Sequence, residues 1–374
     1  MDKEYSMEYH DFTVSRAPLL DVLRSSQAIL DKKAENDAIK LAIIANSTLD
    51  LSISDGAMFL QAQIPLQLGS LAHGIPRELY LPIGILYDLI RRLDVQQVRF
   101  KVFEKNVQLE YGYGDFSLTK LHGARKELVV NGNHAQFTIN AAQLTETLRI
   151  LKATMSNDDI RDQFKGISVI LTKDKITLWS TDGIKMSISE LPIDSEVDIE
   201  GIWPRKFVEV ICSITQNYTA IFEMYERHVK CTINNIVIIS PLINAKLLDY
   251  RAIIDIDSCF TTEIVVDSGY LTKKLDRMMI LSETGILFEL DEESRISSWN
   301  KQQSDKGTEI LKEIQLNGTA SKFYVNGSII LGFIRNLKGM ISVAFYEKSK
   351  NIIIRKQNDV FPLYLTKSMT NRKG

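Results

Sequence analysis

One plan of structure occurs three times in this chain at nearly constant spacing. An apolar stretch with helical periodicity begins at Pro82, at Pro204 and at Asn326, so that successive copies lie 122 residues apart. A hairpin pattern follows each stretch and contains an aromatic residue next to a glutamate, at Phe103-Glu104, Tyr225-Glu226 and Tyr346-Glu347. Repetition with such a period indicates three copies of one structural unit, and it argues against an enzyme built around a single pocket.

Composition limits the class of protein. The chain has 374 residues, of which 45% are hydrophobic and 25% are charged, and this is ordinary for a globular protein of two or three domains. No stretch approaches the roughly 20 apolar residues of a membrane helix, and no signal-peptide pattern follows the charged N-terminus. The cysteines Cys212, Cys231 and Cys259 are isolated, which predicts neither a zinc ribbon nor a disulfide framework. We therefore expect a cytoplasmic protein.

The pattern predicts an α+β fold with two β-α-β-type halves in each repeat. A short strand pattern followed by a helical pattern begins the repeats at residues 12–14, 137–139 and 263–266. We predict three domains, each with two helices packed on antiparallel sheets, over residues 1–134, 135–259 and 260–374, the last with a short basic C-terminal tail. The polar stretch Ser297–Gly307 is predicted to be a solvated loop.

The predicted helices concentrate positive charge. They hold fifteen Lys or Arg and six Asp or Glu, a net charge of +9 in a chain whose net charge is −2. These helices are predicted over residues 16–33, 82–93, 140–152, 204–214, 270–278 and 326–338. One interpretation is that the basic faces are ordinary solvated surfaces. The other is that they form one positive surface, which would attract a phosphate backbone without reading its sequence.

Several short motifs stand in a fixed order along the chain. They are Asp115-Phe116-Ser117-Leu118-Thr119, Thr181-Asp182-Gly183-Ile184-Lys185-Met186, Trp203-Pro204-Arg205-Lys206, Leu248-Asp249-Tyr250-Arg251 and Met279-Ile280-Leu281-Ser282. Each motif alone is common. Their order and spacing between Phe12 and Thr366 resemble the bacterial DNA polymerase III β subunit family, the β sliding clamps.

The resemblance implies a function and a set of surfaces. Members of that family form head-to-tail dimeric rings that encircle duplex DNA and tether polymerases and repair factors. Strand edges would be closed by pairing in such a ring. The implied DNA-facing residues are Arg24, Arg91, Arg149, Lys152, Arg205, Lys273, Lys274, Arg277 and Lys338. The implied dimer contacts are Phe116 and Leu118 at one end and Ile280 and Leu281 at the other.

The family also binds partner proteins through an apolar pocket. Polymerase and clamp-loader subunits would insert short hydrophobic peptides there. The positions carried over by the resemblance are Phe164, Thr181, Gly183, Ile184, Lys185, Met186, Leu248, Ile253, Leu363, Tyr364 and Leu365. Ile184-Lys185 replaces the family's His-Arg, Leu248 replaces a proline and Ala252 replaces an arginine, so we expect an altered peptide preference. The alternative is that these residues only pack two domains together.

Motifs of enzymatic chemistry are missing from the sequence. It contains no phosphate-binding loop, no HExxH, no GxSxG and no dinucleotide fingerprint. The five histidines are scattered, and Asp182 is expected to cap a turn. We therefore predict a non-catalytic protein without metal, cofactor or membrane contact. A clamp-derived protein that binds replication partners without tethering DNA, and an enzyme assembled from distant residues, remain the alternatives.

Overall fold

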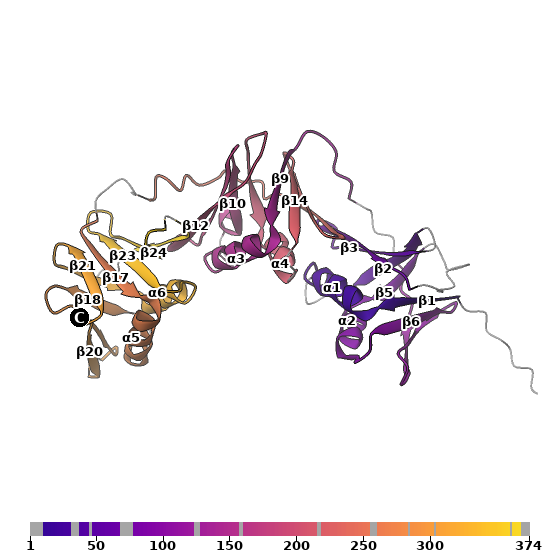
Figure 1. The fold of residues 1–374 in the computed structure, drawn as a ribbon, viewed down its shortest axis with the longest axis horizontal. Helices are drawn as coiled ribbons and strands as arrows, with labels where there is room; N and C mark the ends of the chain where they lie inside the picture. Colours follow the sequence, from indigo (N-terminus) through magenta and orange to yellow (C-terminus); the bar gives the residue numbers. More distant parts are fainter. Residues whose placement is uncertain are drawn as a thin grey trace, which may run out of the picture. The chain divides into compact units, whose positions relative to one another are not determined.

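The computed structural model describes residues 10–30, 37–44, 47–67, 78–122, 128–156, 160–214, 218–254, 260–282, 285–302, 304–359 and 361–367. Within these residues one order of elements, β-α-β-β-β, occurs twice in each of three successive repeats (Figure 1). The two β-α-β-type halves predicted for each repeat are therefore present. The ranges that follow give each half in chain order.

The first repeat comprises β1 (His10–Ser15), α1 (Arg16–Gln27), β2 (Ala38–Ile44), β3 (Thr48–Ser54) and β4 (Phe59–Pro65), then β5 (Leu79–Pro82), α2 (Ile83–Arg92), β6 (Gln97–Val102), β7 (Asn106–Glu110) and β8 (Asp115–Thr119). The second comprises β9 (Ala135–Asn140), α3 (Ala141–Lys152), a 3₁₀ turn η1 (Asp162–Phe164), β10 (Gly166–Leu171), β11 (Lys175–Thr181) and β12 (Lys185–Pro192), then β13 (Ile199–Pro204), α4 (Arg205–Ser213), β14 (Thr219–Met224), β15 (His228–Ile233) and β16 (Ile236–Pro241). The third comprises β17 (Thr262–Asp267), α5 (Ser268–Leu281), β18 (Ile286–Leu290), β19 (Arg295–Trp299) and β20 (Lys306–Ile310), an additional strand β21 (Ile314–Gly318), then β22 (Ser321–Val325), α6 (Gly327–Ile334), β23 (Met340–Tyr346), β24 (Asn351–Lys356) and β25 (Leu363–Lys367).

The sheets join one repeat to the next. The strand orders are β1-β6-β7-β8, β5-β2-β3-β4-β16-β15-β14-β9, β13-β10-β11-β12-β25-β24-β23-β17-β21 and β20-β19-β18-β22. Strand β4 of the first repeat pairs with β16 of the second, and β12 of the second pairs with β25 of the third. We call each such pairing of strands from two repeats a joint. The edges of the two four-stranded sheets are β1 and β8 in one and β20 and β22 in the other.

The described residues gather into two compact units. Unit 1 contains Met1–Thr145, Asp194–Ile199 and Trp203–Leu242, and unit 2 contains Glu146–Ile193, Glu200–Ile202 and Ile243–Gly374. The β4–β16 joint therefore lies inside unit 1, and the β12–β25 joint lies inside unit 2. The second repeat contributes strands to both units.

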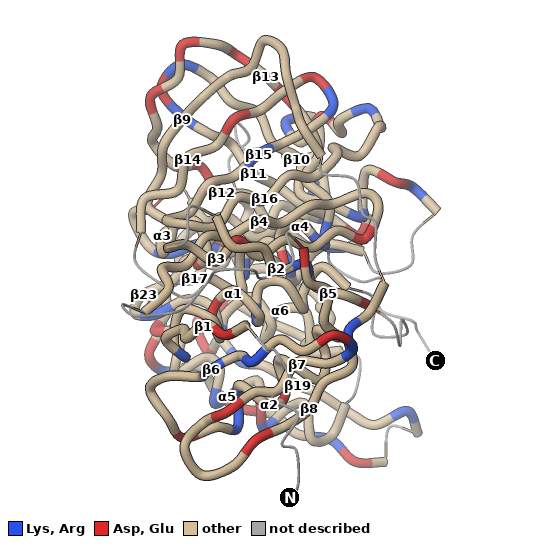
Figure 2. Tube along the Cα trace, turned by 90° about the vertical axis from the view of Figure 1, so that its right-hand side faces the viewer, with Lys and Arg blue, Asp and Glu red and all other residues tan. Residues whose placement is uncertain are grey.

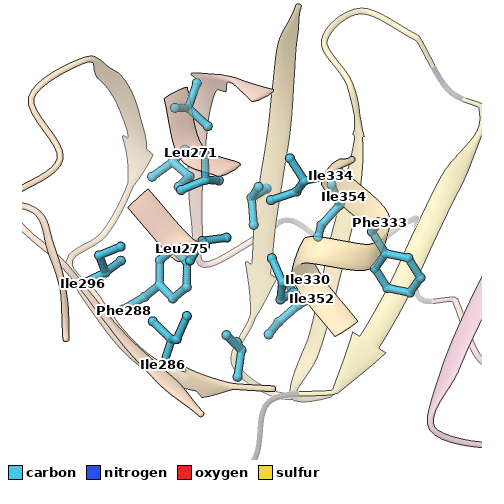
Figure 3. Packing of buried hydrophobic residues seen from close by; sticks show 14 of the residues in the cluster. Leu271, Leu275, Ile286, Phe288, Ile296, Ile330, Phe333, Ile334, Ile352 and Ile354 are labelled. Carbon is cyan, nitrogen blue, oxygen red and sulfur yellow. The ribbon is translucent and has the colours of Figure 1, made fainter. Parts of the chain in front are cut away.

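In the first and third repeats, the apolar core lies between the two helices and the sheets they cover. Helices α1 and α2 lie side by side, as do α5 and α6 (Figure 1). In the third repeat Leu271 and Leu275 of α5 meet Ile330 and Ile334 of α6 over Phe288 of the sheet (Figure 3). Apolar residues spaced three or four apart produce these helix faces, and burial of each side chain stabilises the fold by about 1.5–3 kcal/mol.

Three sequence-based boundaries were wrong. Helix α1, predicted over residues 16–33, ends at Gln27. The stretch Ser297–Gly307 contains the end of β19 and the start of β20, so the loop predicted there is confined to the residues between Trp299 and Lys306. Helix α6 ends at Ile334, so Lys338 lies in the following loop. The expected domain boundary near residues 257–259 lies outside the described residues. No helix among those described is long and apolar enough to cross a membrane.

Candidate functional site

A tight turn between β11 and β12 forms one end of the predicted peptide site. The Thr181 hydroxyl accepts a hydrogen bond from the Gly183 N–H at 2.9 Å and donates one to the Lys185 carbonyl at 2.8 Å. The Asp182 carboxylate accepts hydrogen bonds from the N–H groups of Ile184 and Lys185, both at 2.9 Å. Gly183 has φ +88°, which favours glycine at this position. Asp182 therefore holds the turn, as the sequence predicted.

An apolar cluster lies behind this turn in unit 2. The β12–β25 pairing sets Met186 opposite Leu365 and Ile188 opposite Leu363. The cluster consists of Trp179, Met186, Ile188, Tyr250, Ile254, Ile353, Leu363 and Leu365, with Leu248, Ile253 and Phe361 packed at its margin. Met186, Leu363 and Leu365 are almost fully buried, whereas the side chain of Ile184 is 66% exposed. A ligand can therefore reach the margin of the cluster more easily than its centre.

Phe164 closes the other side of the turn. It is buried at the end of η1, and the guanidinium of Arg161 lies 4.0 Å from the centre of its ring. A side chain at Gly183 would come within 3.1 Å of Arg161 and 3.3 Å of Phe164. The contact explains why glycine suits position 183 for packing as well as for its backbone angle.

Two contacts at this site were missed by the sequence analysis. The tilted rings of Trp179 and Tyr250 have centroids 4.8 Å apart inside the cluster, and Arg161 covers Phe164. Trp179 could have been found, because it stands two residues before Thr181 and residues two apart in a strand share a face. Arg161 carries no comparable signal in the sequence.

Two predicted pocket residues have other roles in the structure. The Lys185 ammonium donates a hydrogen bond to the Ala153 carbonyl, just after α3, at 2.7 Å. Tyr364 faces the opposite side of β25 from Leu363 and Leu365, because side chains alternate along a strand. It is buried in the core of the third repeat, 4.8 Å from the ring of Phe333, and this burial raises the pKa of Tyr364. Its side chain therefore does not belong to the apolar cluster.

The first joint contains the same turn with a different surface behind it. Ser54 donates to the Met58 carbonyl at 2.8 Å and accepts from the Gly56 N–H at 3.1 Å. Asp55 accepts from the N–H groups of Ala57 and Met58, as Asp182 does in the second joint. Phe59 and Ile239 hold the places of Met186 and Leu365 there, but Gln61 takes the place of Ile188, and Asp50 and Gln63 lie beside it. The β12–β25 joint thus presents the more apolar of the two faces to a hydrophobic peptide.

Several candidate DNA-facing residues form ion pairs within their own helix. Arg24 lies 3.4 Å from Asp21 in α1, Arg91 lies 3.1 Å from Asp88 in α2, and Arg205 lies 4.0 Å from Glu209 in α4. Such exposed pairs stabilise a fold by roughly 1 kcal/mol or less. They also lower the positive charge that each helix offers to a phosphate.

Glu309 neutralises part of α5. Its carboxylate on β20 lies 2.8 Å from the Lys274 ammonium and 2.5 Å from the Arg277 guanidinium. The hydrogen bond from Arg277 is the main cause that lowers the pKa of Glu309 to about 2. Two of the predicted DNA contacts therefore share one anion from a neighbouring strand.

The remaining candidates differ in their exposure to solvent. Lys273 and Arg149 are exposed on α5 and α3, Lys152 is partly exposed, and Lys338 is exposed in the loop after α6. With the observed bounds, the helices hold eleven Lys or Arg and five Asp or Glu. Figure 2 shows both signs of charge along the chain. The excess of positive charge on the helices remains, although it is smaller than predicted.

The predicted dimer contacts differ in their exposure. Ile280 is 81% exposed near the end of α5, and Leu281 beside it is half-buried. On the edge strand β8, Phe116 is 36% exposed and stacks on Tyr111, whereas Leu118 is only 6% exposed. Leu118 thus packs inside its own unit, and Phe116 is the apolar side chain that this edge can offer to a partner.

The described residues offer little for catalysis. They contain no group of three or more His, Cys, Asp or Glu side chains that could hold a metal ion. A cavity of about 410 Å³ in unit 1 lies beside α1 and the β15–β16 turn, and Asp21 is the one carboxylate in its lining. Asp21 is paired with Arg24, and the other polar groups of the lining are amides and hydroxyls. This cavity therefore lacks a paired acid and base.

Comparison with known proteins places the chain among replication proteins. Residues 10–125 match the family described as the N-terminal domain of the DNA polymerase III beta subunit, and residues 138–249 match its central domain. A "Beta sliding clamp" from Buchnera aphidicola subsp. Rhopalosiphum padi is 20% identical over 365 residues, which are 95% of this chain and 98% of that protein. Another from Mycoplasma capricolum is 21% identical over 283 residues, or 74% of this chain and 75% of that one.

Solved structures show the same fold. The DNA polymerase III beta subunit of Thermotoga maritima aligns with a TM-score of 0.87 at 16% identity, and covers 96% of this chain and 99% of its own. The sliding clamp of Pseudomonas aeruginosa, crystallised with griselimycin bound, also aligns with a TM-score of 0.87, at 19% identity, over 97% and 100% of the two chains.

Proposed function

Because the chain belongs to the family of the DNA polymerase III beta subunit, we propose that it is a DNA sliding clamp that encircles duplex DNA as a head-to-tail homodimer. In this proposal it is a non-catalytic, cytoplasmic processivity factor that tethers a polymerase and other partners. Its three domains are residues 1–134, 135–259 and 260–374, as the repeated order of elements suggests.

The single observation that best supports this proposal is the pattern of joints. Strands at the same position in each half pair across the first and second joints, β4 with β16 and β12 with β25. The same positions in the remaining halves are β20 and β8, which are unpaired edges. Unpaired edges favour association with another chain, and a symmetric head-to-tail dimer would close two such joints at once.

A second candidate function is supported by the ion pairs of the helices. Because Asp21, Asp88 and Glu309 neutralise several basic residues, the protein could bind replication partners without holding DNA. Retention on DNA distinguishes the two functions. A topological clamp stays on a closed circle and is lost when the circle is cut, whereas a partner-binding protein is retained on neither substrate.

We propose that partner peptides bind at the margin of the apolar cluster in unit 2. Peptides with a leucine and an aromatic residue are expected to bind, since Leu248, Ile253 and Ile184 offer partly or largely exposed apolar surface there. The preference differs from that of the family because Ala252 and the internally bonded Lys185 replace two arginines. Binding in the micromolar range is expected for an isolated peptide.

Substitution at this margin tests the peptide site. Ile184→Glu combined with Leu248→Glu should weaken peptide binding by about 10- to 100-fold, because the apolar contact of two partly exposed side chains, worth about 1.5–3 kcal/mol together, is lost. Titration of a fluorescent peptide library measures this change. These positions are preferable to Met186 and Leu363, where a buried glutamate would unfold the protein.

A matched control separates specific from general effects. Met340→Glu combined with Val129→Glu introduces the same two charges at residues that are 44% and 72% exposed, and it should leave peptide binding unchanged. Equal binding by the parent and the double variant would show that the cluster only packs the two repeats together.

Removal of the Glu309 charge tests the DNA surface. Glu309→Gln should strengthen binding to duplex DNA severalfold at low salt and steepen its salt dependence, because Lys274 and Arg277 lose the anion they share. Glu289→Gln is the control, since Glu289 bridges Arg295 and Lys322 in the same manner and its pKa is also lowered to about 2. If both variants bind DNA equally tightly, α5 does not face DNA. Anisotropy titrations at two salt concentrations measure both variants.

A further inference from the structure

The cavity of about 410 Å³ in unit 1 lies at the first joint. Its lining combines α1 and the end of β4, from the first repeat, with the end of α4 and the β15–β16 turn, from the second. Val22, Ile233 and Ile236 are buried at its floor, whereas Gln63 and Asn234 are exposed at its mouth. The cavity thus has an apolar floor, a polar mouth and the size of a small-molecule site.

The helix α3 of the second joint is the equivalent of α1. Phe12 of β1 and Phe137 of β9 each stack on a phenylalanine of the neighbouring strand, just before these helices. Phe137 follows Phe12 by 125 residues, which sets the offset between the two helices. The equivalent residues are therefore Asp21 with Glu146 and Ser25 with Ile150.

The strand β25 of the second joint is the equivalent of β16. Ile238 lies opposite Leu60 of β4, and Tyr364 lies opposite Ser187 of β12. Leu60 and Ser187 hold the same place, because each pairs with the residue just before the Ser-Asp-Gly or Thr-Asp-Gly turn of its joint. Tyr364 is therefore the equivalent of Ile238.

An aromatic ring fills the second joint between its helices and its sheet. Tyr364 is fully buried, its ring centroid lies 4.8 Å from that of Phe333 in α6, and Ile150 packs against the same core. Burial raises the pKa of the Tyr364 hydroxyl, and the carboxylate of Glu146 raises it further, so the two groups lie near each other. The second joint thus holds a phenol close to a carboxylate.

The first joint has smaller side chains in these places. Ile238 stands where the second joint has the ring of Tyr364, and Ser25 stands where it has Ile150. The cavity lies beside these positions, and Asp21 in its lining takes the place of Glu146. The side chain of Asp21 is 36% exposed, and the described lining contains no lysine or arginine. An uncharged phenol suits this space, because its ring restores the missing volume and its O–H donates to a carboxylate.

We propose that this cavity binds a ligand with a hydroxyphenyl ring next to an amide group, the chemistry of a small aromatic amide or of a tyrosine in a partner protein. The ring lies on the apolar floor and its hydroxyl donates to Asp21. The amide meets the side chains of Gln63 and Asn234 at the mouth. This proposal does not depend on the proposed clamp function.

N-acetyltyramine is the probe for this chemistry, because it carries a hydroxyphenyl ring and one amide. It should bind the full chain with a dissociation constant of about 1 mM, as expected for a ligand of its size. N-acetylphenethylamine lacks only the hydroxyl and should bind about 5- to 10-fold more weakly, because the hydrogen bond to Asp21 is lost. Ligand-observed NMR titration measures both compounds. Equal binding of the two, or no saturable binding of N-acetyltyramine, would overturn the proposal.

Two variants locate the probe in the cavity. Ser25→Ile gives the first joint the residue that the second joint has in this place, so it should weaken binding of N-acetyltyramine about 10-fold or more by filling the floor. Asp21→Asn should weaken N-acetyltyramine and leave N-acetylphenethylamine unchanged, a difference that misfolding would not produce. Asp88→Asn is the matched control, since it removes a carboxylate that is paired with Arg91 in α2 and lies outside the lining. It should change neither affinity. Unchanged binding of N-acetyltyramine by both cavity variants would show that the compound binds elsewhere.

A peptide distinguishes the two sources of the ligand. The peptide acetyl-Gly-Tyr-Gly-amide presents the same ring within a polypeptide chain. If it competes with N-acetyltyramine and binds more tightly, the cavity receives a tyrosine of a partner protein. If only N-acetyltyramine binds, the ligand is a free aromatic amide.

Discussion

Replacement of Ile280 and Leu281 by glutamate is expected to convert the dimer to a monomer at micromolar concentration. Ile280 is 81% exposed in the single chain, and Leu281 beside it is half-buried, so both can offer apolar surface to a second copy. Two apolar contacts would be lost, and two carboxylates would have to be desolvated without partners. Because the proposed ring has two such contacts, both would fail together. Sedimentation velocity measures the change.

A second variant guards against simple misfolding. Ile280→Glu alone changes a side chain with little contact inside its own chain, so the fold should stay intact while association weakens. Ile85→Glu places the same charge on a residue of α2 that is 54% exposed, and it should remain dimeric. If the variant with both substitutions forms dimers as stable as those of the parent protein, the end of α5 is not part of the dimer interface.

Reversal of the exposed basic residues is expected to have the largest effect on DNA binding. Arg149→Glu, Lys273→Glu and Lys338→Glu together should flatten the log–log salt dependence by about 2 to 3, since each phosphate contact contributes roughly 0.9 to the slope. Affinity at low salt should fall steeply for every DNA sequence alike. Anisotropy titrations with short duplexes from 50 to 200 mM salt measure both quantities.

The control variant has the same net charge as this triple variant. Lys173→Glu, Lys348→Glu and Lys350→Glu reverse three exposed lysines in hairpin turns, outside the helices. If charge alone governed binding, both triple variants would lose the same affinity. A helix-lined DNA surface requires that the helix variant loses more.

The sequence predicted the repeats well, because they depend on local periodicity. The aromatic-Glu pairs at Phe103, Tyr225 and Tyr346 all stand at the end of the first strand of a hairpin, as the spacing indicated. The α+β halves of each repeat were predicted for the same reason, because strand and helix patterns depend on residues close together in the sequence. Edge strand β20 escaped prediction because exposed strands need few apolar residues, and its alternation is polar.

Contacts between distant residues could not be predicted. Glu309 pairs with Arg277, 32 residues away, and no local sequence pattern predicts an ion pair over that distance. Tyr364 was assigned to the peptide site with Leu363 and Leu365, although strand alternation sets it on the other face. Alternation alone would have separated the three residues. The resemblance to a family indicates which residues lie near the peptide site, but the strand to which each residue belongs decides which way its side chain points.

The interleaving of the two units in the sequence has a consequence for synthesis of the chain. Strand β4 ends at Pro65, but its partner β16 begins only at Ile236, so unit 1 cannot be completed until well over half of the polypeptide has left the ribosome. Until then β4 is an unpaired edge on a half-built sheet. Pairing over such a sequence distance is slow, and an exposed edge invites aggregation. Asp50, Gln61 and Gln63 make one face of this sheet partly polar, and we expect this polarity to limit aggregation of the nascent chain during the interval.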